Sequence, residues 1–132
     1  MKVKNFDRGQ EQNFIEFIKS QEETDILILF KLNIRSIKIL PKNLKKLYIY
    51  RCDMLEYICD FPETLTVIDI YNCLSLTKLP KFPSELQSLY VEETSINSFI
   101  DIPDKTRVVI GKRDSFEFVK DKFRFLKYCI FH

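Results

Sequence analysis

One stretch of nine residues, LKKLYIYRC at 44–52, decides the fold because its pattern recurs twice further along the chain. The second copy reads LTVIDIYNC at 65–73, and the third reads LQSLYVEET at 86–94. Each copy has apolar residues at its first, fourth and sixth positions. A pattern that recurs at a fixed period predicts that every copy forms the same small structural unit.

Prolines mark the same period. Pro41, Pro62, Pro83 and Pro103 are spaced 21, 21 and 20 residues apart, and each follows an apolar residue. Two weaker copies flank the three strong ones, TDILILFKL at 24–32 and TRVVIG at 106–111, and both begin with threonine in place of leucine. We therefore expect about five repeats between residues 24 and 111.

Apolar and outward-facing residues alternate within each copy, which is typical of a β-strand. Leu47 and Ile49 are expected to face the interior, and Tyr48 and Tyr50 to face outward. One such strand cannot bury its apolar side alone, but parallel copies stacked about 4.8 Å apart build a continuous core. Because 20–21 residues per unit leave little room for a helix, and because proline lacks an amide donor, we expect the return side to be extended.

These features resemble the leucine-rich repeat family, whose unit reads L-x-x-L-x-L-x-x-N/C/T-x-L. The linkage LPKFPSEL at 79–86 is similar to the LPxLPxxL subclass known from bacterial effector proteins and to short repeats of large-virus and amoebal proteins. The resemblance covers about residues 24–111. It implies a leucine-rich repeat solenoid, of the α/β class by family but here mostly parallel β with an extended convex side.

The sequence departs from the family at the ladder asparagine. Cys52, Cys73 and Thr94 stand at this position in the three strong copies, and the family accepts both residue types. Leu32 stands there in the first copy and cannot form a hydrogen bond through its side chain. We therefore expect an irregular first turn.

Residues 1–132 read as a single domain in which the repeats at 24–111 have a cap at each end. For the N-terminal cap, 1–23, we expect Asp7 to N-cap a helix that runs to about Ser20 and covers the first strand. A helix lying on a membrane surface is the alternative, and the acidic residues of this segment disfavour it. The apolar face of that helix consists of Phe14, Phe17 and Ile18.

The C-terminal cap, 112–132, has two possible forms. Ser115 could cap a helix, whereas the alternation of Phe123, Arg124 and Phe125 also allows a strand. The apolar tail 125–132 is expected to pack on the last repeat, or alternatively to contact a partner.

The outward residues of stacked strands form columns, and these columns are the candidate binding surface on the concave side. One column holds Ile28, Tyr48, Asp69, Tyr90 and Ile110, and the next holds Phe30, Tyr50, Tyr71, Glu92 and Lys112. Tyrosine is enriched at binding sites, although tyrosines also suit exposed strands for purely structural reasons. We expect a peptide or a protein patch to contact Phe30, Lys46, Tyr48, Tyr50, Arg51, Asp69, Tyr71, Asn72, Tyr90 and Glu92.

The composition argues against an enzyme. The only histidine is the last residue, and the only glycines are Gly9 and Gly111, so histidine-based triads and phosphate-binding glycine loops are not expected. We expect no catalytic residue, no cofactor and no metal site. The four cysteines lack a Cys-x-x-Cys spacing and are expected to be reduced thiols, with Cys52 and Cys73 stacked in the turns.

The expected partner is therefore another protein, bound by a monomer in the cytoplasm, or in the host cytoplasm if the chain is a viral or secreted host-interaction factor. No signal peptide or membrane span is expected from the sequence. A net charge of +2 is too small to indicate nucleic acid. The alternative function is binding of nucleic acid or an anionic surface through the basic segment 105–127.

Overall fold

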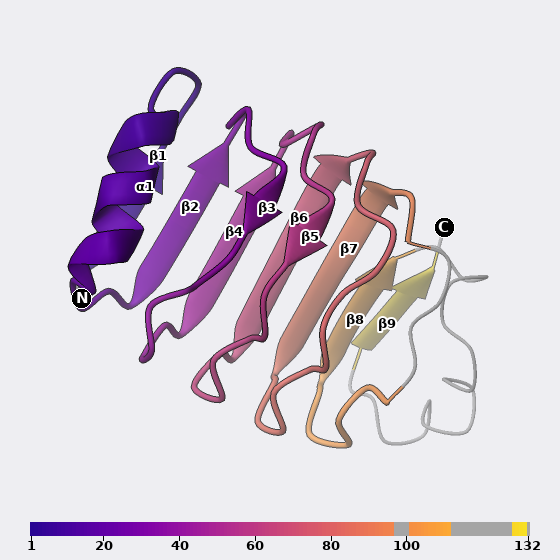
Figure 1. Cartoon of the computed structure of the whole chain (residues 1–132). Coiled ribbons are helices and arrows are strands. Elements are labelled where there is room, and N and C mark those ends of the chain that lie inside the picture. Colours follow the sequence, from indigo (N-terminus) through magenta and orange to yellow (C-terminus); the bar gives the residue numbers. More distant parts are fainter. Residues whose placement is uncertain (97–100, 112–127, 132) are drawn as a thin grey trace.

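The computed structural model describes residues 1–96, 101–111 and 128–131, and in these the chain forms mostly parallel β-sheet (Figure 1). The large sheet has seven strands in the order β1-β2-β4-β6-β7-β8-β9, and every neighbouring pair is parallel. Its strands are β1 (Val3–Phe6), β2 (Ile26–Phe30), β4 (Lys46–Tyr50), β6 (Val67–Cys73), β7 (Ser88–Thr94), β8 (Val108–Gly111) and β9 (Tyr128–Phe131).

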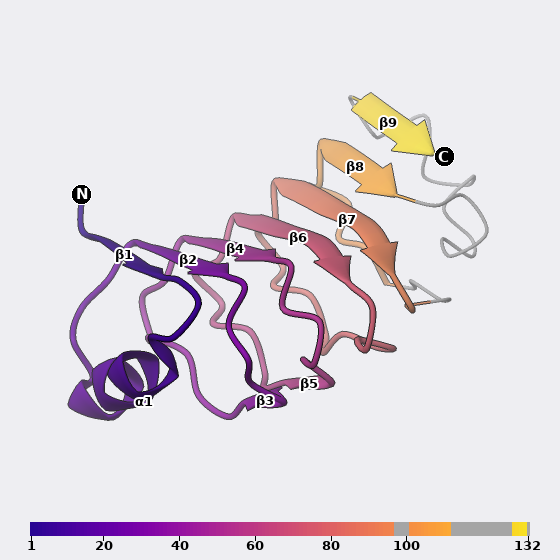
Figure 2. The ribbon, with the colours of Figure 1, turned by 90° about the horizontal axis from the view of Figure 1, so that it is seen from above.

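The return segments run along one side of this sheet. Two of them contribute short parallel strands, β3 (Ser36–Ile37) and β5 (Tyr57–Ile58), which pair with each other. Figure 2 shows the return segments and α1 (Glu11–Ser20) on the same side, with the opposite face of the sheet open. The expectation of extended rather than helical returns is confirmed for the described residues.

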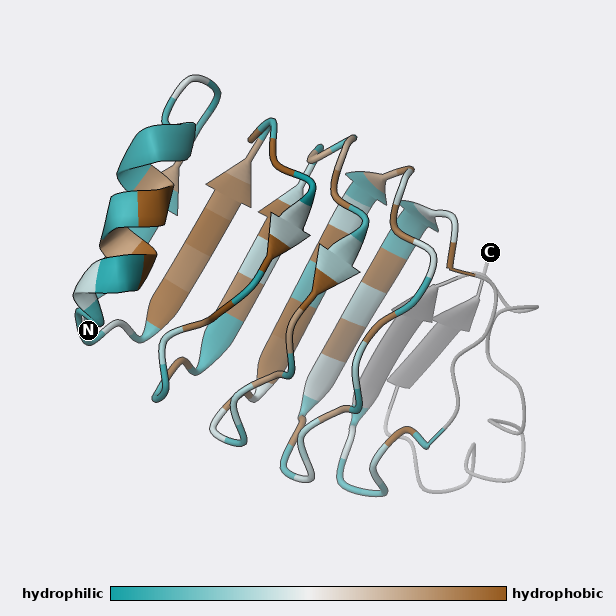
Figure 3. Ribbon diagram, in the orientation of Figure 1, coloured by the Kyte–Doolittle hydropathy of each residue, from teal (hydrophilic) through white to brown (hydrophobic). Residues whose placement is uncertain are grey.

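The core lies between the sheet and the returns. Successive strands place Leu27, Leu47, Ile68 and Leu89 in one register row, and all four are fully buried. Hydrophobic and more hydrophilic residues alternate along β4 and along the first part of β7 (Figure 3), as expected for strands with one buried face. Each fully buried aliphatic side chain contributes about 1.5–3 kcal/mol through removal from water.

The proline-led turns are the same in each unit. The amide of the third residue after the proline donates to the proline carbonyl at all four positions, with N–O distances of 3.0–3.3 Å. The threonines that replace leucine at this point are buried and hydrogen-bonded: Thr106 Oγ1 donates to the Leu86 carbonyl at 3.0 Å, and Thr24 Oγ1 to that of Glu22 at 3.3 Å. Threonine is thus accommodated without an unpaired hydroxyl.

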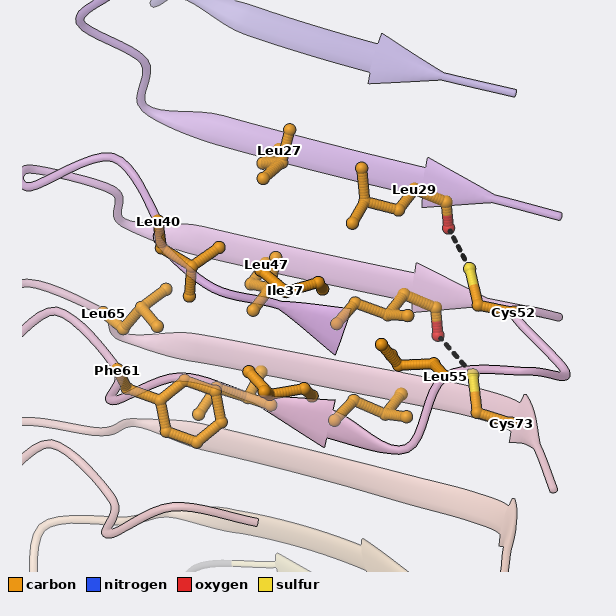
Figure 4. Close-up of a cluster of buried hydrophobic side chains, with 14 of the residues drawn as sticks. Leu27, Leu29, Ile37, Leu40, Leu47, Cys52, Leu55, Phe61, Leu65 and Cys73 are labelled. Atoms are coloured by element: carbon orange, nitrogen blue, oxygen red, sulfur yellow. Dashed lines mark hydrogen bonds between the residues drawn. The ribbon is translucent and has the colours of Figure 1, made fainter. Parts of the chain in front are cut away.

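Cys52 and Cys73 form the expected stack inside the turns (Figure 4). The Cys52 thiol donates to the Leu29 carbonyl at 3.9 Å, and the Cys73 thiol donates to the Ile49 carbonyl at 3.7 Å. Both side chains are fully buried and both thiols are free. Each thiol also lies near a carbonyl two residues before it, that of Tyr50 at 3.6 Å for Cys52 and that of Tyr71 at 3.5 Å for Cys73. Each thiol therefore has acceptors both in its own unit and on the neighbouring strand.

The expectation of an irregular first turn is confirmed in part. In the next two units the amides of Leu55 and Leu76 donate to the carbonyls of Cys52 and Cys73, at 3.1 and 3.3 Å, and residues 53–54 and 74–75 form turns, whereas residues 32–34 form none. The start of the first turn is nevertheless like that of the others. Lys31 has a positive φ of 58°, close to the 55° of Arg51 and Asn72 in the following units. Its amide donates to the Tyr50 carbonyl just as the Arg51 amide donates to that of Tyr71. Leu32 is 1% exposed, so its burial in the core stands in place of a side-chain hydrogen bond.

The N-terminal segment differs from the expectation in two ways. Strand β1 pairs with β2, so a strand rather than the helix covers the edge of β2. The helix begins at Glu11 with Gln10 as N-cap, because Asp7 lies in the turn after β1, where its carbonyl accepts from the Gln10 amide at 3.0 Å. The end at Ser20 was predicted correctly.

Three phenylalanines join the helix to the sheet. Phe14 and Phe17 of α1 are buried, and their ring centroids lie 5.5 and 5.2 Å from that of Phe6 on β1. Asp25 stabilises the start of β1, because its carboxylate accepts a hydrogen bond from the backbone amide of Lys2 at 2.8 Å. That hydrogen bond holds the pKa of Asp25 below its usual value.

The C-terminal tail is described only at Tyr128–Phe131, which pairs in parallel with β8 as strand β9. This is the packing on the last unit that we expected for the tail. The two alternatives for the rest of the C-terminal cap, a helix beginning at Ser115 or a strand around Phe123–Phe125, lie outside the described residues. In the part of the chain that the structure describes, no helix is long and apolar enough to cross a membrane.

Candidate functional site

The open face of the large sheet carries the predicted columns in the predicted register. Ile28, Tyr48, Asp69, Tyr90 and Ile110 are successive register partners from β2 to β8. Phe30, Tyr50, Tyr71 and Glu92 form the second column, while Lys112 lies outside the described residues. We call the outward residues of β2, β4, β6 and β7 the tyrosine face; its candidate binding residues are Phe30, Lys46, Tyr48, Tyr50, Asp69, Tyr71, Tyr90 and Glu92.

Two features of this surface were missed from the sequence. Strand β1 extends the first column by Asn5, which lies opposite Ile28. Arg51, Asn72 and Glu93 follow the second column directly in sequence, and all three have positive φ, between 52° and 55°. Asparagine at 72 is a known signal for this conformation, whereas arginine and glutamate are not.

A hydrogen bond joins the two columns at the centre of the face. The Tyr50 hydroxyl donates to the Asp69 carboxylate at 2.5 Å, from β4 to β6. Burial, this hydrogen bond and the charge of Asp69 raise the pKa of Tyr50 well above its usual value. The bond fixes both side chains in one arrangement before any partner binds.

Asp69 is half-buried, and burial is the main cause that raises the pKa of its carboxyl. The hydrogen bond from Tyr50 acts in the opposite direction, and the negative charge of Glu92 raises the pKa further. The pKa of Tyr48 is also raised, mainly by burial and then by the charge of Asp69. The centre of the face therefore holds a carboxylate whose negative charge is poorly compensated.

Aromatic rings surround this carboxylate. The ring of Tyr50 lies 6.2 Å from that of Tyr48 and 6.3 Å from that of Tyr71, the second pair in an edge-to-face arrangement at 81°. These spacings fall in the range of favourable aromatic pairs. At the neighbouring strand, the ammonium of Lys31 lies 5.0 Å from the centre of the Phe30 ring.

An open hollow of about 480 Å³ lies over these side chains. Its lining contains four aromatic residues, two acidic residues and one basic residue. The lining residues are Phe30, Tyr50, Arg51, Asp69, Ile70, Tyr71, Tyr90 and Glu92. Seven of these eight also belong to the candidate binding surface expected from the sequence; Ile70 is the exception.

The chain matches no protein-family model, no curated protein and no solved structure. Within the described residues, no group of three or more His, Cys, Asp or Glu side chains could hold a metal ion. Asp69 and Glu92 lie on adjacent strands but in different columns of the face.

The second candidate surface, the basic segment 105–127, falls largely outside the described residues. The described part shows Lys105 paired with Glu85, with the ammonium 2.9 Å from a carboxylate oxygen. Both side chains are exposed, so the pair is worth little. Lys105 is thus already matched with an acidic neighbour.

Proposed function

We propose that this chain is a non-enzymatic leucine-rich repeat solenoid that binds a peptide or a protein patch on its tyrosine face. In this proposal about five repeats at 24–111 form the solenoid, and the protein works as a cytoplasmic monomer, possessing no cofactor. The observation that carries the proposal is the hollow lined by Tyr50, Tyr71 and Tyr90, which come from three adjacent parallel strands.

The repeated backbone supports the solenoid part of the proposal. The same proline-led turn recurs four times. The same positive φ recurs at corresponding positions of four units: at Lys31 and Arg51, directly after β2 and β4, and at Asn72 and Glu93, the next-to-last residues of β6 and β7. Recurrence of backbone detail at the period of the sequence repeat is what stacked repeat units produce.

The rigidity of the face supports a binding role. The tyrosines project from paired strands, and the Tyr50–Asp69 hydrogen bond orders two central side chains in advance. Ordering before binding reduces the entropy lost on association. Tyrosine provides a large contact area with few rotatable bonds, which is why it often dominates binding energy.

A peptide-display library tests the proposal without knowledge of the natural partner. The library is selected against the intact chain, and bound peptides are retested against the double variant Tyr50→Ala/Tyr71→Ala. The matched control is Tyr57→Ala, because Tyr57 is 52% exposed on β5, on the side opposite the tyrosine face. Peptides that bind the intact chain and the control, but not the double variant, support the proposal. Peptides that bind the double variant as tightly as the intact chain contradict it.

Salt dependence distinguishes the proposed function from the alternative, in which segment 105–127 binds an anionic partner. Affinity that depends on phosphate contacts falls steeply as salt rises. We expect the selected peptides to bind nearly as well after neutralisation of Lys120, Lys122 and Arg124. Loss of binding in that variant, together with steep salt dependence, would favour the anionic partner instead.

A further inference from the structure

The hollow on the tyrosine face combines two chemistries that recognise cations. Phe30, Tyr50, Tyr71 and Tyr90 contribute aromatic rings to its lining, and Asp69 and Glu92 contribute carboxylates. Arg51 is the only base in the lining, which leaves one net negative charge at neutral pH. An aromatic ring attracts a cation over its face, and a nearby carboxylate adds a charge-assisted hydrogen bond.

Asp69 is placed to serve as the acceptor. Tyr50 holds the carboxylate through one oxygen, Oδ2, and a carboxylate has acceptor sites on both oxygens. Burial and the charge of Glu92 both raise the pKa of this carboxyl. A cation in the hollow would offset both effects by pairing with the buried charge.

The same face already holds a cation over a ring. The Lys31 ammonium lies 5.0 Å from the centre of the Phe30 ring, within the usual distance for such a contact. Phe30 also lines the hollow. One ring of this face, that of Phe30, therefore attracts a cation in the geometry expected for such a contact.

We propose that the hollow binds the guanidinium group of an arginine side chain on the partner. This inference rests on the proposed function, since it names the group that the partner presents. Arginine fits better than lysine because a planar guanidinium stacks on an aromatic face while it donates two parallel hydrogen bonds to a carboxylate. A lysine ammonium is a compact, strongly hydrated charge that cannot make both contacts as well.

The direct test is an NMR titration of the ¹⁵N-labelled chain with N-acetyl-arginine amide. The matched probe is N-acetyl-citrulline amide, which has nearly the same shape but no charge, and N-acetyl-lysine amide is the third probe. We expect saturable shifts at the backbone amides of Tyr50, Asp69 and Tyr71 with the arginine probe. The citrulline probe should bind at least about tenfold more weakly, because a hydrogen bond to a charged group is worth about 1.5–3 kcal/mol.

Variants assign the contacts. Asp69→Asn retains an oxygen that accepts from Tyr50 and should weaken arginine binding about tenfold. Tyr71→Ala should weaken it about threefold through loss of one ring face. Arg51→Asn removes the competing charge, suits the positive φ and should strengthen binding about threefold.

Tyr57→Ala on β5 is the control and should leave the titration unchanged, and an unchanged spectrum away from each mutation shows that a variant has folded. Equal shifts from the arginine and citrulline probes, or shifts confined to other acidic surfaces, would overturn the inference. If peptide capture still required Tyr50 and Tyr71 in that case, the proposed function would stand. The opposite result is arginine-specific shifts at the hollow together with peptide binding that does not depend on Tyr50 and Tyr71. That result would support a guanidinium site in the hollow and overturn the proposed function.

Discussion

The Tyr50 hydroxyl and the Asp69 carboxylate form a diagonal pair across β4 and β6, 2.5 Å apart. Register places Tyr50 opposite Tyr71 and Asp69 opposite Tyr48, so this one bond connects the two columns. This hydrogen bond lowers the pKa of Asp69, but burial raises the pKa by more. The charge on Asp69 therefore affects the stability of the folded chain.

The first prediction concerns pH. The pKa of Asp69 is higher in the folded chain than in the unfolded chain, so the folded state binds more protons between these two values. The contribution of Asp69 to the free energy of unfolding should therefore fall as pH rises from about 4 through the folded pKa, and level off above it. Asp69→Asn should remove this decline, and Tyr50→Phe should steepen it, because loss of the hydrogen bond raises the pKa of Asp69 further.

Urea unfolding at a series of pH values from 3.5 to 8 measures these slopes. Glu63→Gln provides the control, because Glu63 is exposed and the change in net charge is the same. An Asp69→Asn chain with the same pH slope as the Glu63→Gln chain would show that Asp69 does not carry the effect.

The second prediction concerns the recurring positive φ. Glu93 has a φ of 52°, a conformation that costs an ordinary L-residue about 1–2 kcal/mol and asparagine or glycine less. Glu93→Asn should therefore raise the free energy of unfolding by about 0.5–1 kcal/mol. Asn72→Val should lower it by about 1–2 kcal/mol, because a β-branched side chain is least suited to this region.

Denaturant melts of both variants test this pair. Glu93→Gln is the matched control, since it removes the charge but keeps the strained backbone. Equal stabilisation by Glu93→Asn and Glu93→Gln would assign the gain to charge rather than to backbone conformation.

The sequence predicted the columns of the tyrosine face because strand side chains alternate with period two and the prolines fix the spacing between strands. Leu47 and Tyr48 were assigned to opposite faces on this basis, and the structure places them so. The positive φ at Arg51 was not predicted, because arginine has no special preference for that region. The hollow was not predicted either, since it depends on how Tyr50 and Asp69 orient toward each other.

Strand β1 was missed for a different reason. It has four residues, of which only Phe6 is buried, so its alternation is too short to stand out beside the adjacent helical pattern. Asp7 was taken as a helix cap because aspartate favours that position. The chain instead turns at Gly9, whose φ of 86° suits glycine, before the helix begins at Glu11.

The third prediction concerns the thiols. Cys52 and Cys73 are buried and free. The interaction with Cys73 and burial raise the pKa of Cys52, whereas the interaction with Cys52 lowers the pKa of Cys73. Both side chains are fully buried, so we expect burial to keep a thiol reagent from either sulfur in the native state. In a Cys59→Ser/Cys129→Ser variant, a thiol reagent should detect no free thiol in the native state and two after denaturation. Detection of no thiol after denaturation would reveal a disulfide between Cys52 and Cys73 and contradict the prediction.

The last prediction concerns the N-terminal segment. Strand β2 is apolar at all five positions, Ile26–Phe30, and β1 covers its outer edge. Deletion of residues 1–22 would leave this edge unpaired, and an exposed apolar edge strand promotes association. We expect the truncated chain to oligomerise or precipitate at concentrations where the full chain remains monomeric, as measured by light scattering after size exclusion.

A point variant separates the loss of the strand from the loss of the helix contact. Phe6→Ala keeps the β1 backbone but removes the ring that packs on Phe14 and Phe17. It should lower the free energy of unfolding by about 3–5 kcal/mol, as for other buried phenylalanines, while the folded protein stays monomeric because β1 still covers the edge of β2. A truncated chain that remained monomeric with an unchanged melting curve would show that residues 1–22 are not needed to prevent association through the edge of β2. A folded Phe6→Ala chain that associated as strongly as the truncation would assign the protection to the helix contact rather than to strand pairing.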